Sequence, residues 1–147
     1  MANAIYPLGR QKFANGELAW KSGGDTFSFG LVKTGYTYSA SHEFMSDLST
    51  YCIGGTGLNT YADMVTLANT VNALGVLDAD DPSSSIIYEN GGSHNSVIAI
   101  VIFKKVSTLA NSPLVAYIDT ATGLPITTNG AGIPIAWDNG ANKIAKL

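Results

Sequence analysis

The sequence predicts a mainly β protein, an antiparallel β-sandwich or irregular barrel with one short N-terminal helix and a second short helical turn. Three features lead to this fold class. About six to eight short apolar stretches fit strands, turn-forming Gly, Asn and Asp residues separate them, and one or two brief segments fit helices. No linker-like stretch divides the 147 residues, so a single domain over residues 1–147 is expected.

The N-terminal segment is expected to form the short helix. Asn3 can cap it by accepting hydrogen bonds from the free amides of the first turn, and Pro7 is tolerated near such a start. Gly16 suits a left-handed C-terminal cap. The apolar face would combine Ile5, Leu8 and Phe13. Such a helix should lie on a sheet or on a neighbouring protein.

A strand and a helical turn are expected next. Phe27, Phe29 and Leu31 alternate with smaller residues, and this two-residue period places them on one face of a strand. Further along, Ser41 is expected to cap a single helical turn that ends at Leu48.

The middle of the chain leaves alternatives open. Residues 51–61 contain three glycines and fit either a loop or a broken edge strand. Apolar residues between 64 and 77 are largely β-branched, which favours strands joined by a turn or bulge near Asn72. A helix over residues 61–74 is the alternative. A short strand is expected at residues 86–88.

The last third of the chain supplies the strongest strands. Residues 97–103 are apolar on both faces, which predicts a central strand covered on both sides, and residues 114–118 predict a second core strand. Residues 133–137 alternate, but Pro134 lacks an amide donor, so this strand should lie at an edge. Residues 143–147 should form a last short strand or a tail.

The low content of charged residues limits which kinds of function are expected. Charged residues make up 13% of the chain, against roughly 25% in an average domain. A surface built mainly from uncharged polar residues repels copies of itself only weakly, which favours assembly. The net charge is -3 and no cationic cluster exceeds Lys104–Lys105, so nucleic-acid binding is not expected.

Neither a membrane nor a secretory location is expected. The apolar stretch at residues 97–103 is too short to cross a bilayer. The first residues do not have a charged region followed by an apolar one, so they do not match a signal peptide. The protein is therefore expected to be made and folded in a cytoplasm.

The sequence offers no catalytic, cofactor or metal motif, and we do not expect an enzyme. His42 and His94 lack metal-ligand spacing, and no Gly-x-Ser-x-Gly elbow accompanies the serines. Cys52 is the single cysteine, expected to be a small buried residue. The acidic turn at residues 78–81 lacks EF-hand spacing and is interpreted as solvated, with a cation site as the alternative.

Aromatic and helix-face residues are the candidate interaction residues. Tyr and Trp near turns and element ends can serve as interface anchors, because they bury much apolar area at low entropic cost. The alternative is that they cover the ends of the core. The candidates are Ile5, Tyr6, Leu8, Phe13, Trp20, Tyr36, Tyr38 and Trp137.

Four stretches of the chain have a distinctive sequence. They are Met-Ala-Asn-Ala-Ile-Tyr-Pro at 1–7, Tyr-Thr-Tyr-Ser-Ala-Ser-His-Glu-Phe at 36–44, Tyr-Ile-Asp-Thr-Ala-Thr-Gly-Leu-Pro at 117–125 and Trp-Asp-Asn-Gly-Ala-Asn-Lys at 137–143. They resemble a family of small virion proteins of tailed bacteriophages. The resemblance extends, with gaps, over most of the chain and contains no catalytic motif.

The resemblance implies a virion component made in the bacterial host cytoplasm. A capsid decoration (cement) protein is expected, homo-oligomeric in the particle, which bridges neighbouring copies of the major capsid protein or contacts another virion protein. The N-terminal helix or residues 143–147 could dock or add a strand. One alternative is a tail or tail-tip subunit, which would need a long exposed hairpin. Another is a carbohydrate-binding module at residues 137–139. Residues 51–61 and 83–95 depart from the family pattern.

Overall fold

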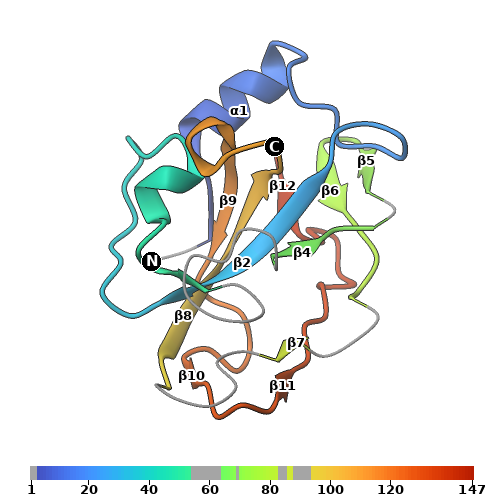
Figure 1. Ribbon diagram of the computed structural model, residues 1–147. Coiled ribbons are helices and arrows are strands. Elements are labelled where there is room, and N and C mark those ends of the chain that lie inside the picture. The colour runs from blue at the N-terminus through green and yellow to red at the C-terminus, as the bar shows by residue number, and fades with distance from the viewer. Residues whose placement is uncertain (1–2, 54–63, 69, 83–85, 88–93) are drawn as a thin grey trace.

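The main element of the protein is a seven-stranded antiparallel sheet. The computed structural model describes residues 3–53, 64–68, 70–82, 86–87 and 94–147 (Figure 1). The strands of this sheet are β1 (Ala4–Ile5), β2 (Phe27–Lys33), β3 (Cys52–Ile53), β4 (Val65–Thr66), β8 (Ser96–Lys104), β9 (Leu114–Ile118) and β10 (Ile126–Thr127). Their order is β1-β9-β8-β2-β3, with β10 beside β8 and β4 beside β2. The predicted mainly β, antiparallel fold class is confirmed.

The centre of the sheet is buried on both faces, as predicted. Strand β8 pairs with the whole length of β2 and, on its other side, with β9. Phe27, Phe29 and Leu31 lie in the core on one face, which confirms the predicted alternation. Val32 and Cys52 lie in a second core cluster on the opposite face.

A smaller layer completes a sandwich-like arrangement. Strands β5 (Val71–Ala73), β6 (Val76–Asp78) and β12 (Ala145–Lys146) form a three-stranded antiparallel sheet in the order β12-β6-β5, and β7 (Ile86–Ile87) pairs with β11 (Gly132–Ile133). The buried indole of Trp20 donates from Nε1 to the carbonyl of Asp78 at 2.8 Å. This bond joins the segment before β2 to the smaller sheet.

The β5–β6 turn lies two residues later than predicted. The chain reverses at Leu74 and Gly75, whose φ angles of 53° and 79° are both left-handed, and not near Asn72. Two consecutive positive φ angles are what a tight hairpin turn requires, and Gly75 meets this requirement without steric cost. Where residues 61–74 are described, they form strands and not the alternative helix; residues 61–63 and 69 lie outside the described part.

The extreme N-terminus differs from its prediction. Ile5 lies in β1, which pairs with β9, and not on the helix. Asn3 does not cap the helix: its Oδ1 accepts from the backbone amides of Asp119 and Thr120 at 3.0 and 3.1 Å. Pairing with a strand more than a hundred residues away satisfies these backbone groups, and this outweighs an extra helical turn.

The predicted N-terminal helix, α1, spans Pro7–Ala14. Proline suits its first turn because the amide that it lacks has no helical partner there. The helix packs closely on β9 at Gly9, where a Cβ atom would lie 2.6 Å from the Leu114 carbonyl oxygen. Gly16, with φ 73°, takes the left-handed conformation predicted for the C-terminal end.

The second helical turn is the 3₁₀ helix η1 (Met45–Leu48), which confirms the predicted end at Leu48. Its N-cap residue is Phe44 and not Ser41, and the side chain of Asp47, inside the turn, satisfies the backbone amides at its start. The Asp47 carboxylate accepts from the backbone amides of Glu43 and Phe44 at 2.8 and 3.1 Å. A further 3₁₀ turn, η3, spans Leu109–Asn111.

The C-terminal segment is only partly strand. The predicted edge strand at 133–137 is reduced to β11, because Pro134 cannot donate and the Trp137 amide instead donates to Asp81 Oδ1 at 2.6 Å. The predicted last strand is confirmed as β12. Of residues 51–61, Cys52 and Ile53 form β3 and residues 54–61 lie outside the described part, as does residue 88 of the stretch predicted at 86–88.

Candidate functional site

Four of the predicted interaction residues are buried within the chain itself. Tyr6 is 0% exposed, Trp20 2%, Tyr36 7% and Trp137 7%. The burial of these four aromatics fits the alternative that they cover the core. The other four candidates, Ile5, Leu8, Phe13 and Tyr38, are half-buried.

Five tyrosines gather on one face of the main sheet and form what we call the tyrosine cluster: Tyr6, Tyr36, Tyr38, Tyr51 and Tyr117. The Tyr6 and Tyr36 hydroxyls lie 3.0 Å apart, and the Tyr36 hydroxyl is 2.8 Å from His42 Nδ1. Burial raises the pKa of Tyr117 to about 12 and also raises the pKa values of Tyr6 and Tyr36. The Tyr6 and Tyr36 hydroxyls thus partner each other, and the rings of Tyr38, Tyr51 and Tyr117 pack around them.

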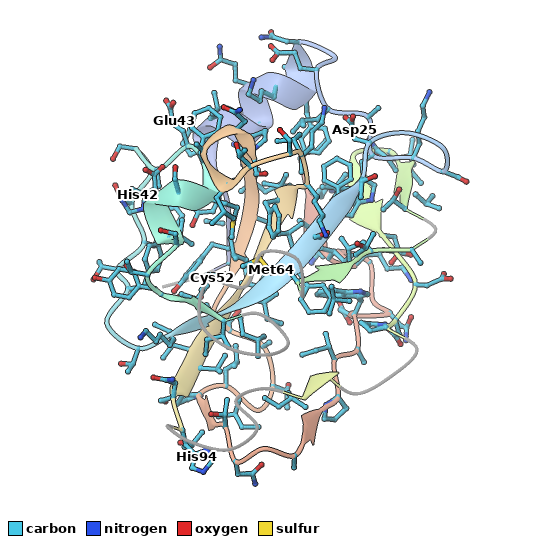
Figure 2. All side chains as sticks on the ribbon, in the orientation of Figure 1. Asp25, His42, Glu43, Cys52, Met64 and His94 are labelled. Carbon is cyan, nitrogen blue, oxygen red and sulfur yellow. The ribbon has the colours of Figure 1, made fainter. Side chains whose placement is uncertain are left out.

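The side chains with catalytic potential are dispersed or inaccessible. His42 and His94 lie far apart (Figure 2). Cys52 is fully buried, and burial raises its pKa to about 12, so it stays a neutral thiol near neutral pH. Within the described part of the chain, no group of three or more His, Cys, Asp or Glu residues could hold a metal ion.

Two carboxylates of the predicted acidic turn contact other parts of the protein. Asp81 accepts from the Trp137 amide, and Asp78 Oδ2 lies 3.6 Å from Lys143 Nζ. These carboxylates therefore position the C-terminal segment. No helix among the described residues is long and apolar enough to cross a membrane.

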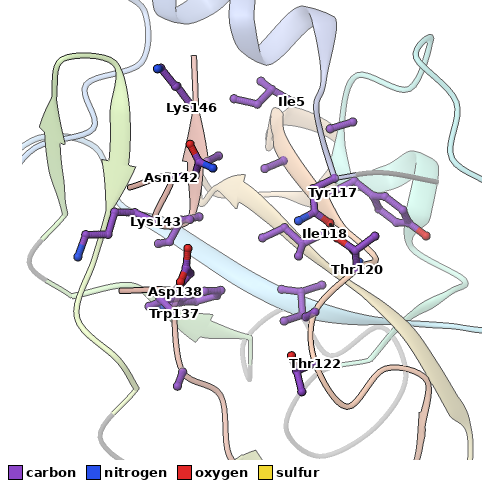
Figure 3. A pocket seen from close by; sticks show the side chains of 18 of the residues that line it. Ile5, Tyr117, Ile118, Thr120, Thr122, Trp137, Asp138, Asn142, Lys143 and Lys146 are labelled. Carbon is purple, nitrogen blue, oxygen red and sulfur yellow. Dashed lines mark hydrogen bonds between the residues drawn. The ribbon is translucent and has the colours of Figure 1, made fainter. Parts of the chain in front are cut away.

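The face opposite the tyrosine cluster contains an open groove of about 980 Å³ (Figure 3). It lies between β1 and β9 on one side and residues 134–146 on the other; we call it the C-terminal groove. Ile5 pairs with Ala116 and Ile100 with Ile118. Directly opposed residues of antiparallel strands share a face, so these four side chains form an apolar floor, in which Ile5 is half-buried and the other three are buried.

The opposite wall of the groove includes Trp137 and β12. The Trp137 ring packs edge-on against Phe29, with ring centroids 5.2 Å apart and an interplanar angle of 87°. Its Nε1 is buried and finds no hydrogen-bond partner among the described residues. Because the ring is almost fully covered, residues 137–139 do not present the exposed aromatic platform that a sugar-binding face needs.

Cationic residues line the groove. They are Arg10, Lys143 and Lys146, with Asp138 as the one carboxylate among the described lining residues. The Lys143 side chain extends away from the groove toward β6, where Asp78 is its ion-pair partner (Figure 3). Asp138 Oδ1 also accepts from the Gly140 amide at 3.0 Å, which holds the turn before Lys143. The groove thus concentrates three of the eight Lys and Arg residues of a chain whose net charge is -3.

A second surface feature is the apolar hairpin tip, defined by Val71, Leu74 and Leu147. Leu74 is 100% exposed, Val71 51% and Leu147 38%. The Leu147 amide donates to the Gly75 carbonyl at 2.8 Å, which places the C-terminus beside the hairpin turn. Leucine in a left-handed conformation costs about 1 kcal/mol and gains no burial here, so the tip is suited to contact with another molecule.

Sequence reasoning missed both surfaces. The groove residues come from the two ends of the chain, and only the pairing of β1 with β9 and of β12 with β6 brings them together. One signal was available, since three of the eight Lys and Arg residues occur in the first ten and last five positions. For the tip, the signal was a leucine directly before a turn glycine.

Comparison with protein-family models, with curated protein sequences and with solved structures gave no match.

Proposed function

We propose that this chain is a structural protein of a bacteriophage virion, a capsid decoration protein that bridges and stabilises neighbouring major capsid subunits. The observation that carries the proposal is the pair of contact surfaces, the C-terminal groove and the apolar hairpin tip, on a scaffold whose central sheet is buried on both faces. The sequence resemblance to virion proteins supports the same class.

The architecture suits a bridging role. A small domain with two contact surfaces can touch two neighbours, and many copies on a shell make individually weak contacts collectively strong. The low charge content lets copies pack side by side as a homo-oligomer in the particle. In this proposal the partner is the major capsid protein or another virion protein. The role needs no enzyme activity, cofactor, nucleic acid or membrane.

The two alternatives have less support. A ring-stacking tail subunit would need a long hairpin, whereas β5 and β6 have three residues each. A carbohydrate-binding module would need exposed aromatics in a row, whereas Trp137 is 7% exposed. The position of the chain in purified virions separates these cases: many copies on the head, or a few on the tail.

The direct test is binding to capsids that lack the protein. The purified protein should cosediment with them to a saturating, fixed ratio to the major capsid subunit, and it should raise the temperature at which the shell comes apart. If the protein stays in the supernatant at micromolar concentration, the decoration role is wrong.

The Leu74→Asn substitution tests the hairpin tip. Asparagine tolerates the left-handed turn, so the fold should be unchanged or stabilised by up to about 1 kcal/mol while the exposed apolar group is lost. We expect capsid binding to weaken by about tenfold, the effect of losing roughly one buried apolar side chain. The matched control is Thr127→Asn, at an exposed position on β10. Equal weakening by both variants would exclude a specific role for the tip.

A further inference from the structure

We infer that the C-terminal groove takes an extended segment of the partner capsid subunit, one that carries both carboxylate and apolar side chains and adds as a strand to the outer edge of β12. This inference rests on the proposed function, and it names the chemistry that the partner must present.

Charge complementarity argues for carboxylates on the partner. Arg10 and Lys146 are exposed and make no ion pair within the described part of the chain, and Lys143 is 3.6 Å from its only ion-pair partner there, Asp78. Asp138 offsets one of these three charges. Outside the groove, by contrast, Lys12 and Lys104 are closely paired, with Glu17 at 2.7 Å and with Asp25 at 2.8 Å. The groove therefore attracts an anionic partner although the chain as a whole is acidic.

The strand edge argues for an extended backbone. In its three-stranded sheet β12 is the outermost strand, with β6 on one side and no described strand on the other. Ala145 and Lys146 of β12 line the groove, opposite the floor formed by β1 and β9 (Figure 3). An added strand gains backbone hydrogen bonds from such an edge, and the alternation of its side chains gives specificity.

The floor argues for apolar side chains on the face of the added strand that meets the sheet. Ile100, Ala116 and Ile118 are buried, so the apolar surface that the groove exposes comes from half-buried Ile5 and from Pro134 and Ala136 on the opposite wall. Alternate residues of a strand project to opposite sides, so apolar residues can meet this surface while the intervening acidic ones reach the cationic rim. Nucleic acid could pair with the cations of the groove, but it offers neither apolar side chains for the floor nor a peptide backbone for the strand edge. A protein segment therefore fits the groove better.

The experiment compares two charge-reversal pairs on shells assembled from the major capsid protein without DNA. Arg10→Glu with Lys146→Glu reverses two exposed groove cations. The control, Lys21→Glu with Lys33→Glu, makes the same change of net charge away from the groove. Binding is measured by cosedimentation as a function of concentration and salt, and circular dichroism verifies folding.

We expect the groove pair to weaken binding at least about tenfold and to flatten its salt dependence, because charge-assisted contacts are lost. The control pair should stay within about threefold of the unmodified protein. If the unmodified protein binds and both pairs bind equally well, the groove inference is overturned while the decoration role stands. If the unmodified protein does not bind these DNA-free shells, both are overturned.

Crosslinking identifies the occupant. A photoreactive amino acid at Thr122, exposed in the groove lining, is compared with one at Ser107, exposed outside it. Crosslinks from Thr122 should map by mass spectrometry to one extended capsid segment that contains Asp or Glu between apolar residues. Crosslinks from Thr122 to a basic or helical segment, or only to other copies of this chain, would contradict the inference.

Discussion

The two faces of the main sheet are built differently, although both are anchored by the same N-terminal strand. Tyr6 enters the tyrosine cluster and is fully buried, whereas its neighbour Ile5 is half-buried in the floor of the C-terminal groove. On the cluster face, the Tyr6 and Tyr36 hydroxyls pair with each other, and the Tyr36 hydroxyl also pairs with His42. On the groove face, a buried indole donor and two exposed cations find no partner among the described residues.

This difference separates stability from recognition. Polar groups that already partner each other, as the Tyr6 and Tyr36 hydroxyls do, gain little from a ligand, whereas exposed cations without a partner gain free energy when a partner supplies acceptors. We therefore assign the tyrosine cluster to holding the fold and the groove to binding. The division can be tested at two adjacent residues, because Ile5 lies on the groove face and Tyr6 on the cluster face.

The largest expected effect is the loss of stability when Tyr6 is truncated. Tyr6→Ala should lower the free energy of unfolding by about 3–5 kcal/mol, because it leaves a cavity and removes the partner of the Tyr36 hydroxyl. Ile5→Ala, one residue away, should cost about 1 kcal/mol, since the groove already exposes part of that side chain. Urea unfolding measures both. Equal costs would remove the distinction between the faces.

Alkaline pH should weaken the cluster face next. An unfolded tyrosine has a pKa near 10, while burial raises the pKa of Tyr117 to about 12 and raises those of Tyr6 and Tyr36. The unfolded chain loses these protons first. The stabilisation is therefore complete below pH 10 and is lost as pH rises through 12, by up to about 1.4 kcal/mol per pH unit for each tyrosine.

Urea midpoints between pH 8 and 12 measure this loss. Tyr117→Phe is the control because it keeps every lysine while it removes one titrating tyrosine, so its midpoint should fall less steeply with pH. Parallel curves for the two proteins would show that the cluster does not contribute to the alkaline instability.

The smallest expected effect on stability is that of the groove cations. Arg10→Glu with Lys146→Glu should change the free energy of unfolding by less than about 0.5 kcal/mol, as is usual for surface positions outside packed contacts. The same variant is expected to bind the capsid more weakly, so affinity should fall while the free energy of unfolding stays nearly unchanged. A stability loss above about 2 kcal/mol would mean that these residues support the fold.

The parts predicted correctly from the sequence are those whose signal is local. Residues 97–103 are apolar on both faces of the strand, and large apolar residues alternate with smaller ones over residues 27–31. Each of these patterns predicts which face of the strand is buried. The role of Asn3 could not be predicted, because its partners at Asp119 and Thr120 are brought near only by the β1–β9 pairing. The groove was missed for the same reason.

The burial of the aromatics was missed for a related reason. Trp20 and Trp137 lie beside turns in the sequence, which favours exposure. Each nevertheless reaches a core partner from another element: Trp20 packs against Phe27 with centroids 4.4 Å apart, and Trp137 packs against Phe29. The position of a residue along the chain does not reveal such contacts.

A cryo-EM reconstruction of the intact virion, at a resolution that shows side chains, tests the central claim most directly. The account predicts many copies of this chain on the outside of the head, each with an extended, acid-bearing capsid segment beside β12 in the C-terminal groove. A head without this chain, or a bound chain whose groove is open to solvent while the tyrosine-cluster face meets the shell, would contradict it.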